Sequence, residues 1–248
     1  DIGEVSFEKR STVYSPSFSV DPENTEPYPL ELDDLTRLHW LVTSNKMTTV
    51  LEFGIGYSTL VMAHAIRQNS NKYGDYVKQN LRRNNAFEIW SVDTNKEYIN
   101  LSLNRIPKKY KKYVNAMFSH VRMSEYCGKI CTIFDALPNI CPDFIYLDGP
   151  DQFTTKGEIR GIHNRHPDRL PMVADLLSLE YYLLPGTIIL TDGRTSNARF
   201  LRNNFQREWS YIHDPNIDIS LFRLDESPLG RYNRLELEFK AGDPNNKN

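Results

Sequence analysis

The sequence predicts an α/β fold built on a doubly wound, mostly parallel sheet. Short apolar runs that end in glycine or aspartate recur along the chain and alternate with segments of helical periodicity. In residues 49–60 such a run passes directly into two glycines and a helix start, the arrangement by which an open α/β sheet forms a nucleotide site. A chain of 248 residues, 40% of them hydrophobic, can bury the core of one such domain.

The predicted domain occupies residues 31–241. Residues 1–30 form an irregular N-terminal arm, because four prolines between positions 16 and 29 exclude a regular helix there. A lid, a dimer arm and packed extended chain all fit this arm. Residues 242–248 form a polar tail that we expect to be frayed.

The predicted strands are apolar runs bounded by turn residues or acids. Residues 50–53 and 143–148 are continuous runs typical of buried strands, and residues 187–192 repeat the pattern after the breaker at Pro185-Gly186. The full set spans residues 50–53, 87–93, 114–122, 143–148, 187–192, 209–213, 219–224 and the alternating 235–239.

The predicted helices have apolar residues on one face. In residues 32–42, Asp33 and Asp34 stand in the first turn, where the helix dipole favours acids. A helix that begins near Ser58 continues into a polar helical extension and loop through residue 85. Further helices are predicted within 95–103, 168–180 and 193–205.

Composition excludes some partners. The net charge of −2 provides no general attraction to nucleic acid or anionic membranes, and the basic cluster in 108–112 is typical of a solvated face. No apolar run approaches the roughly 18 residues of a membrane span, and no signal peptide is evident. Cys127, Cys131 and Cys141 lack metal-ligand spacing, which indicates free thiols in a reducing compartment. We therefore expect a cytoplasmic protein with a small-molecule substrate, no nucleic-acid partner and no membrane partner; a homo-oligomer is left open.

The glycine turn indicates which cofactor the site takes. Gly54 and Gly56 allow a sharp bend close to a ligand, and Ser58 or Thr59 is placed to cap the helix. A dinucleotide fingerprint requires glycine in place of Thr59 and sets a pyrophosphate at the helix start. Glu52, inside the turn, would repel a pyrophosphate but suits a ligand with an ammonium and a sulfonium group. That ligand is S-adenosylmethionine; the alternative is an ordinary strand–helix turn without a ligand.

The run Glu52-Phe-Gly54-Ile-Gly56-Tyr-Ser58-Thr59 resembles the first motif of class I S-adenosylmethionine-dependent methyltransferases, in the small-molecule and sugar O-methyltransferase-like branch. The resemblance covers roughly residues 45–225. It implies a Rossmann-like methyltransferase fold whose seven-stranded sheet has an antiparallel strand near the C-terminus. It also implies that the residues of this motif bind the cofactor.

Asp93 ends the second predicted strand, where an acid can accept hydrogen bonds from two ribose hydroxyls. It follows the glycine turn by nearly 40 residues instead of the usual ~20, and the polar insertion before it accounts for the difference. Capping of the next helix is the alternative role.

Asp148 and Asp192 end two strands that we expect to be neighbours, so both face the ligand crevice, with Asp148 toward the reacting centre and the cofactor. Methyl transfer is an in-line displacement that needs an aligned acceptor and help with its proton. With Asn197, the two acids offer oxygen ligands for Mg²⁺, which resembles the metal-dependent O-methyltransferases. Gly193 stands where those enzymes carry a second acid or amide.

A metal-free base is the alternative. His163, His166 and Asp151 are candidates, the histidines in a long loop of a kind that is usually functional or mobile. Arg160 and Arg194 are candidates, with Asn197, for binding an anionic group of the acceptor. Surface salt bridges are the competing role for both arginines.

These observations predict O-methylation of a small polar acceptor, such as a sugar or nucleotide-linked sugar hydroxyl, because the crevice rim is charged and rich in histidine and arginine. An NAD-dependent oxidoreductase is disfavoured by Glu52 and Thr59. A non-catalytic cofactor-binding module on the same fold is the third hypothesis, since a fold does not determine a function.

Overall fold

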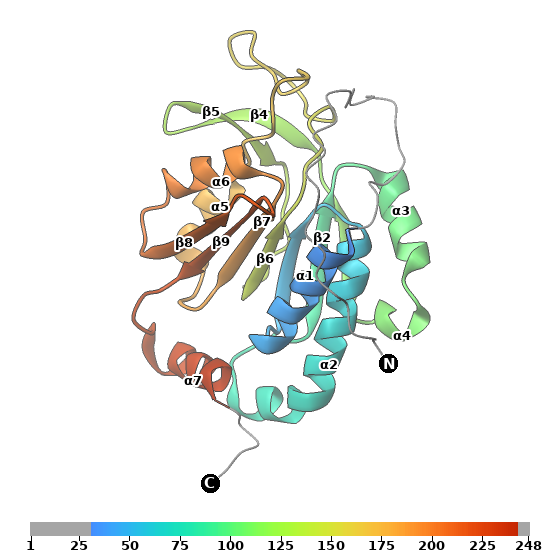
Figure 1. Cartoon of the computed structure of the whole chain (residues 1–248), viewed down its shortest axis with the longest axis vertical. Helices are drawn as coiled ribbons and strands as arrows, with labels where there is room; N and C mark the ends of the chain where they lie inside the picture. The colour runs from blue at the N-terminus through green and yellow to red at the C-terminus, as the bar shows by residue number, and fades with distance from the viewer. Residues whose placement is uncertain (1–30, 243–248) are drawn as a thin grey trace.

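A computed structural model describes residues 31–242; the predicted N-terminal arm and the tail from residue 243 lie outside this part. Its centre is a seven-stranded sheet in the order β3-β2-β1-β6-β7-β9-β8 (Figure 1). The strands are β1 Thr49–Phe53, β2 Glu88–Asp93, β3 Val114–Phe118, β6 Phe144–Leu147, β7 Ile188–Asp192, β8 Trp209–Asp214 and β9 Ile219–Leu224.

The first five of these strands in the sheet are parallel, and β9 pairs antiparallel with both β7 and β8. The chain runs outward from β1 to β3 and then returns to β6 on the other side of β1. The predicted fold class is therefore confirmed. In such sheets ligands bind where the strand order reverses, outside the carboxyl ends of the strands, which here means beyond β1 and β6.

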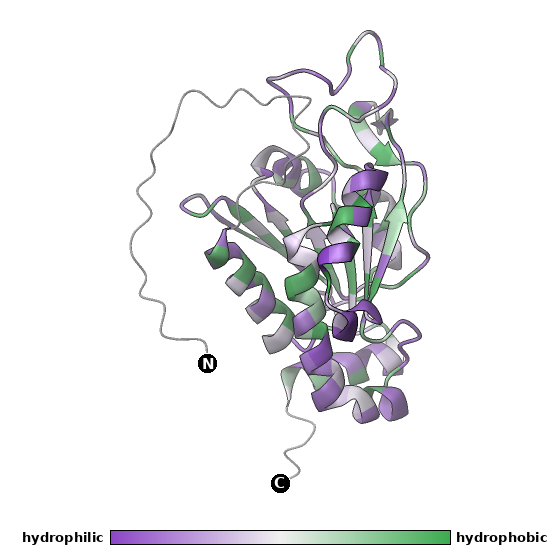
Figure 2. Ribbon diagram, turned by 90° about the vertical axis from the view of Figure 1, so that its right-hand side faces the viewer, coloured by the Kyte–Doolittle hydropathy of each residue, from purple (hydrophilic) through white to green (hydrophobic). Residues whose placement is uncertain are grey.

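Helices cover both faces of the sheet. The helices are α1 Leu32–Ser44, α2 Tyr57–Asn80, α3 Lys96–Arg105, α4 Lys108–Lys111, α5 Asp175–Leu179, α6 Thr195–Arg202 and α7 Gly230–Ala241, with a 3₁₀ turn η1 at Glu180–Tyr182. Alternate strand residues supply two separate cores: Val50 and Phe144 pack with α1 and α2, whereas Leu51 and Ile145 pack with α5 and α6. In Figure 2 the helices carry both hydrophobic residues (green) and hydrophilic residues (purple), as expected for helices that are buried on one face.

Two elements differ from the prediction. The segment after β3 forms a hairpin of β4 Val121–Tyr126 and β5 Lys129–Phe134, which pair only with each other. Residues 235–239, predicted as a strand, belong to helix α7. The buried face of this helix carries Asn233, Glu236 and Phe239, at helical spacing, so two of its three buried positions are polar and invisible to a search for apolar periodicity.

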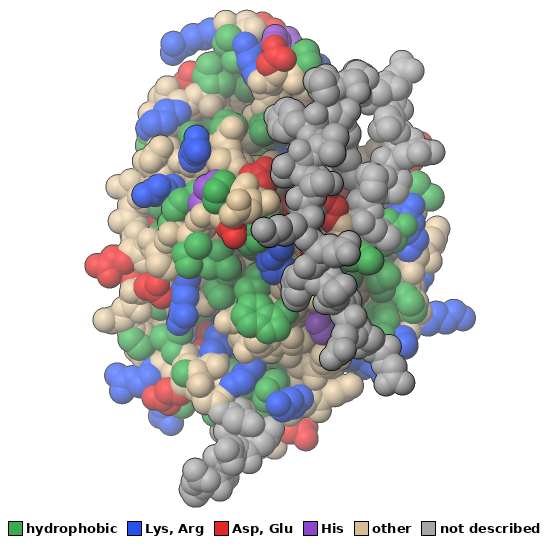
Figure 3. Space-filling view, in the orientation of Figure 1, with side chains coloured by type: hydrophobic (Ala, Val, Ile, Leu, Met, Phe, Trp, Pro, Cys, Tyr) green, Lys and Arg blue, Asp and Glu red, His purple; other side chains and the backbone are tan. Residues whose placement is uncertain are grey.

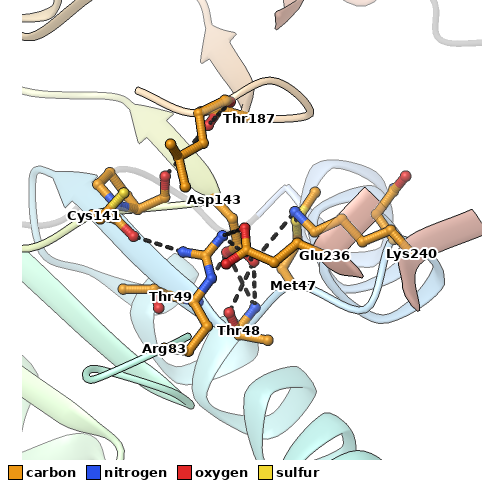
Figure 4. A network of polar contacts seen from close by, with 12 residues as sticks. Met47, Thr48, Thr49, Arg83, Cys141, Asp143, Thr187, Glu236 and Lys240 are labelled. Carbon is orange, nitrogen blue, oxygen red and sulfur yellow. Dashed lines mark hydrogen bonds and ion pairs between the residues drawn. The ribbon is translucent and has the colours of Figure 1, made fainter. Parts of the chain in front are cut away.

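A polar network at the amino edge of the sheet holds α7 in place (Figure 4). Asp143, only 1% exposed, accepts hydrogen bonds from the backbone N–H groups of Thr48 and Thr49. The Lys240 ammonium lies 3.2 Å from its carboxylate and the Arg83 guanidinium 3.8 Å. Arg83 also pairs with Glu236 of α7 at 2.9 Å. These contacts join the starts of β1 and β6 and the segment after α2 to the C-terminal helix.

Within residues 31–242, no helix is long and apolar enough to cross a membrane. The three cysteines carry free thiols, as predicted; Cys127 and Cys141 are exposed and Cys131 is buried.

Candidate functional site

The glycine turn lies where β1 and β6 end side by side. Gly54 has a φ of +94°, and a Cβ added to Gly149 would lie 2.7 Å from the Gly54 nitrogen. Glycine is therefore required at both positions, at Gly54 by its backbone conformation and at Gly149 by the contact between the two backbones. The Gly54 N–H donates to the Val92 carbonyl on β2 at 2.8 Å. This bend connects the three strands at the switch point.

Glu52 lies directly beneath the turn and is completely buried. Its carboxylate accepts hydrogen bonds from the hydroxyls of Ser58 at 2.5 Å, Thr59 at 2.6 Å and Ser91. Burial raises the pKa of Glu52 to about 7, against the opposing effect of these hydroxyls, and the charge of Asp148 raises it further. Glu52 thus stabilises the turn through hydrogen bonds to the start of α2. Because it is buried, its negative charge would attract a cationic ligand without direct contact.

Neither Ser58 nor Thr59 stands at the N-cap of α2, contrary to the prediction. Gly56 occupies that position, and its backbone N–H donates to the Thr59 hydroxyl oxygen at 3.0 Å. Thr59 still takes part in capping from the third position of the helix, because its hydroxyl accepts from the Gly56 N–H while it donates to Glu52. The Ser58 hydroxyl donates to Glu52.

Asp93 ties the same turn to the end of β2. Its carboxylate accepts from the N–H groups of Ile55 at 3.0 Å and Asn95 at 2.8 Å. Burial raises the pKa of Asp93, and these backbone hydrogen bonds oppose the rise. The residue that caps α3 is Asn95, whose side chain accepts from the Tyr98 N–H. Each Asp93 oxygen has a second lone pair for a ligand hydroxyl.

Asp148 stands at the end of β6 with 53% of its side chain exposed, so solvent and ligands reach it. The surrounding protein limits the hydration of this carboxylate and so raises its pKa to about 7. The positive charge of Arg194 lowers the pKa, and the negative charges of Asp192 and Asp93 raise it. The Arg194 Nε lies 4.0 Å from Asp148 Oδ1, and its Nη2 donates to the carbonyl oxygens of Asp148 and Pro150. Through these contacts Arg194 holds the segment after β6, and its predicted role in binding an anionic group of the acceptor stays a prediction.

Asp192, at the end of β7, accepts a hydrogen bond from the Tyr146 hydroxyl at 3.1 Å. Burial raises the pKa of Asp192, and burial likewise raises that of Tyr146 well above its ordinary value. The adjacent strands β6 and β7 thus place Asp148 and Asp192 at the same edge, as the sequence predicts.

The residues predicted to bind Mg²⁺ do not assemble into a metal site. Asn197 is 1% exposed, and its amide exchanges two hydrogen bonds of 3.2 Å with the backbone of Val173. Among the described residues, no group of three histidine, cysteine, aspartate or glutamate side chains is placed to hold a metal. Since Asn197 is hydrogen-bonded to Val173, the predicted set of three ligands is incomplete, and the structure does not support the Mg²⁺ prediction.

The candidate bases other than Asp148 have local roles. The Asp151 carboxylate accepts from the N–H groups of Phe153 and Thr154 and so forms a turn. The Nδ1 of His166 accepts from the Asp168 N–H at 3.2 Å, within the loop. In the part of the chain that the structure describes, no hydrogen bond or ion pair joins these residues to Asp148 or Asp192.

His163 and Arg160 also lie apart from the strand-end acids. His163 lines a different cavity, beside the β4–β5 hairpin. Arg160, with 83% of its side chain exposed, lies 3.6 Å from Glu125 of β4. The structure thus brings together the glycine turn and the strand-end acids but not the histidines and arginine of the loop.

Sequence reasoning missed Ser91, Tyr146 and Gly149. Ser91 is a fully buried hydroxyl inside an otherwise apolar strand, and Tyr146 precedes Asp148 by two residues, on alternate strand positions. Gly149 directly follows a strand-end acid. A polar residue within a buried strand is a signal that could have drawn attention to Ser91. It does not identify the partner, because Glu52 lies 39 residues away in the sequence.

No family model and no curated protein matches the chain. Among solved structures, it is similar to the O-methyltransferase of Streptomyces achromogenes involved in tomaymycin synthesis, in complex with S-adenosylmethionine (10% identity, 80% of this chain and 82% of that one, TM-score 0.43). A Podospora anserina methyltransferase bound to S-adenosylhomocysteine is 14% identical, with 80% of each chain covered and a TM-score of 0.47. A Staphylococcus aureus putative caffeoyl-CoA O-methyltransferase is 11% identical over 81% and 86%, with a TM-score of 0.47.

Proposed function

We propose that this protein is an S-adenosylmethionine-dependent methyltransferase that methylates a hydroxyl group of a small polar acceptor. One observation carries the proposal. Four carboxyl groups gather where the strand order reverses, those of Glu52, Asp93, Asp148 and Asp192. Among the described residues, only Arg194 is a cation within ion-pair distance of any of them.

The pKa values of these four carboxyl groups are all raised, chiefly because the surrounding protein limits their hydration: Glu52 is fully buried, whereas the Asp148 side chain is crowded but half exposed. Their negative charges therefore lack full compensation. Unpaired buried charge is costly, and a cationic ligand lowers that cost. S-Adenosylmethionine carries both a sulfonium and an ammonium group, whereas the diphosphate of NAD would add negative charge. The site therefore favours the methyl donor over the dinucleotide.

The residues of the site suit the parts of this cofactor. The bend at Gly54 and Gly149 leaves backbone without side chains against which a ligand can lie. Asp93 would accept hydrogen bonds from the ribose hydroxyls. The bound cofactor supplies an electrophilic methyl group on sulfur.

Asp148 is the base that the geometry supports. It is exposed, and a pKa of about 7 lets it accept a proton near neutral pH. Asp148 would accept the hydroxyl proton of the acceptor, while the bound cofactor would supply the methyl group and leave as its neutral thioether. Arg194 holds the Asp148 backbone, and Tyr146 holds Asp192, so that both carboxylates keep their places.

A sugar or nucleotide-linked sugar is the acceptor class that we favour. The carboxylates of Asp148 and Asp192 and the neighbouring Arg194 give the proposed site a polar rim, which suits a ligand with many hydroxyls. Figure 3 shows acidic and basic side chains dispersed over the visible face, with no continuous basic stripe of the kind that binds nucleic acid.

Thermal unfolding in the presence of each cofactor tests the proposal. A ligand at 100 times its Kd adds about 2.7 kcal/mol to stability. S-Adenosylmethionine and S-adenosylhomocysteine should raise the melting temperature, and NAD⁺ at the same concentration should not. Stabilisation by NAD⁺ alone would refute the proposal. Transfer of labelled methyl groups to fractionated cell metabolites, lost in Asp148→Asn, would then identify the acceptor.

A further inference from the structure

A second cavity, of about 330 Å³, lies between the β4–β5 hairpin and the loop that follows β6. Thr132 of β5, His163 and Arg169 of the loop and Ser196 of α6 contribute to its lining. Asp148, Asp192 and the glycine turn do not, so this hairpin–loop cavity is separate from the proposed methyl-transfer site. Its volume falls at the lower end of the ~300–1,000 Å³ typical of small-molecule sites.

Two residues of the lining carry buried polar atoms without a hydrogen-bond partner: Thr132 Oγ1 and His163 Nδ1. Thr132 is 1% exposed, and its backbone is fully used, since its N–H donates to Met172 and its carbonyl accepts from the Ala174 N–H. Its hydroxyl alone is unsatisfied. Buried polar groups are nearly always hydrogen-bonded in proteins, so two orphans at one cavity need an explanation.

The rest of the lining defines what kind of ligand fits. Aliphatic and thioether side chains make up much of the lining, which suits a ligand that is mainly apolar; they belong to Met123, Ile130, Ile162, Leu170 and Met172. Asp168 is largely exposed and lies 3.9 Å from His166, and the Arg169 Nη1 donates to the His163 carbonyl at 3.0 Å. Both charged side chains thus contact residues of the loop itself. A hydroxyl group, which both donates and accepts, matches a threonine hydroxyl and an imidazole nitrogen.

We propose that the hairpin–loop cavity binds a neutral, mainly apolar small molecule whose single hydroxyl group hydrogen-bonds to Thr132 and His163. The site is independent of methyl transfer, because none of its residues belongs to the cofactor turn or to the strand-end acids. Buried water at the two orphan atoms is the rival explanation, and it predicts no dependence of binding on a ligand hydroxyl.

Binding of 2-naphthol to the whole protein, measured by its fluorescence and by calorimetry, tests this proposal. Its isostere 2-methylnaphthalene has the same shape without the hydroxyl. We expect 2-naphthol to bind at least tenfold more tightly than 2-methylnaphthalene. Equal affinities, or no binding of 2-naphthol, would overturn the proposal in favour of water.

Variants locate the bound hydroxyl. Thr132→Val and His163→Leu should each weaken 2-naphthol binding about tenfold, whereas His163→Asn, which keeps a polar atom near the Nδ1 position, should retain most of it. Thr155→Val is the matched control, because Thr155 is also 1% exposed with an unpartnered hydroxyl but lies outside the cavity lining. Equal losses in Thr132→Val and Thr155→Val, or none in either cavity variant, would contradict the assignment. Since Thr132→Val removes an unsatisfied hydroxyl, it should fold at least as stably as the original chain.

Discussion

The two edges of the central sheet both bury carboxylates, but they compensate the charge in different ways. At the amino edge, burial tends to raise the pKa of Asp143, yet Lys240, Arg83 and two backbone N–H groups lower it below its ordinary value. At the carboxyl edge, the full burial of Glu52 and the crowding around the half-exposed Asp148 raise the pKa of each to about 7. Neutral hydroxyls surround Glu52, and Arg194 reaches Asp148 only at 4.0 Å.

The difference separates a structural site from a binding site. A buried ion pair complete within the chain, such as Asp143 with Lys240 and Arg83, needs no further partner and connects secondary-structure elements. Acids left with raised pKa values are compensated either by a proton or by a cationic ligand, and such groups gather at functional sites.

The largest effect is expected at Asp148. Asp148→Asn removes the base but keeps the shape, so methyl transfer should fall by about 10²–10⁴-fold, as is usual for the loss of a general base. The change in rate is measured with the identified acceptor at saturating cofactor. Asp151→Asn is the control, because Asp151 stabilises a turn and should retain activity. A rate unchanged in Asp148→Asn would remove this residue from the mechanism.

At the amino edge, Asp143→Ala should destabilise the protein by about 3–5 kcal/mol, since it leaves Lys240 without its carboxylate partner and Arg83 with Glu236 alone. Urea unfolding followed by circular dichroism gives the value. The affinity for S-adenosylmethionine, measured at a temperature where the variant is folded, should stay the same. A loss of cofactor binding in the folded variant would mean that the two edges are coupled.

Glu52→Gln should change how stability depends on pH. With a folded-state pKa of about 7 and an ordinary value near 4.5, folded Glu52 keeps a proton that the unfolded chain releases, so stability falls as pH rises through this window. Glutamine cannot ionise, so the variant should lose less stability, by about 1–3 kcal/mol, between pH 4.5 and 7. Unfolding curves across that range check this. Identical pH profiles would show that Glu52 is ionised throughout.

Much of the fold could be predicted because the strands are apolar runs ended by glycine or acid, as at Phe53-Gly54 and Leu147-Asp148. Helix α7 was mispredicted because Asn233 and Glu236 are buried through partners distant in the chain. The β4–β5 hairpin turns at Cys127-Gly128, both with positive φ, and cysteine is a weak signal for such a turn.

The candidate site was predictable only in part. Residue type and strand position were enough to place Asp93, Asp148 and Asp192 at one edge. The roles of Glu52 and Arg194 were not predictable, because they depend on contacts with Ser91 and with the Asp148 backbone that exist only in the folded chain.

The central claim is that the carboxyl edge is an undercompensated negative site for a cation. Calorimetric titration with S-adenosylmethionine and with S-adenosylhomocysteine, which lacks the sulfonium charge, tests it directly between pH 5.5 and 7.5. Ionisation of Glu52 and Asp148 across this range favours the cation, so the affinity for S-adenosylmethionine relative to S-adenosylhomocysteine should rise with pH, by about three- to tenfold. A ratio that stays constant or falls as the pH rises would contradict the account.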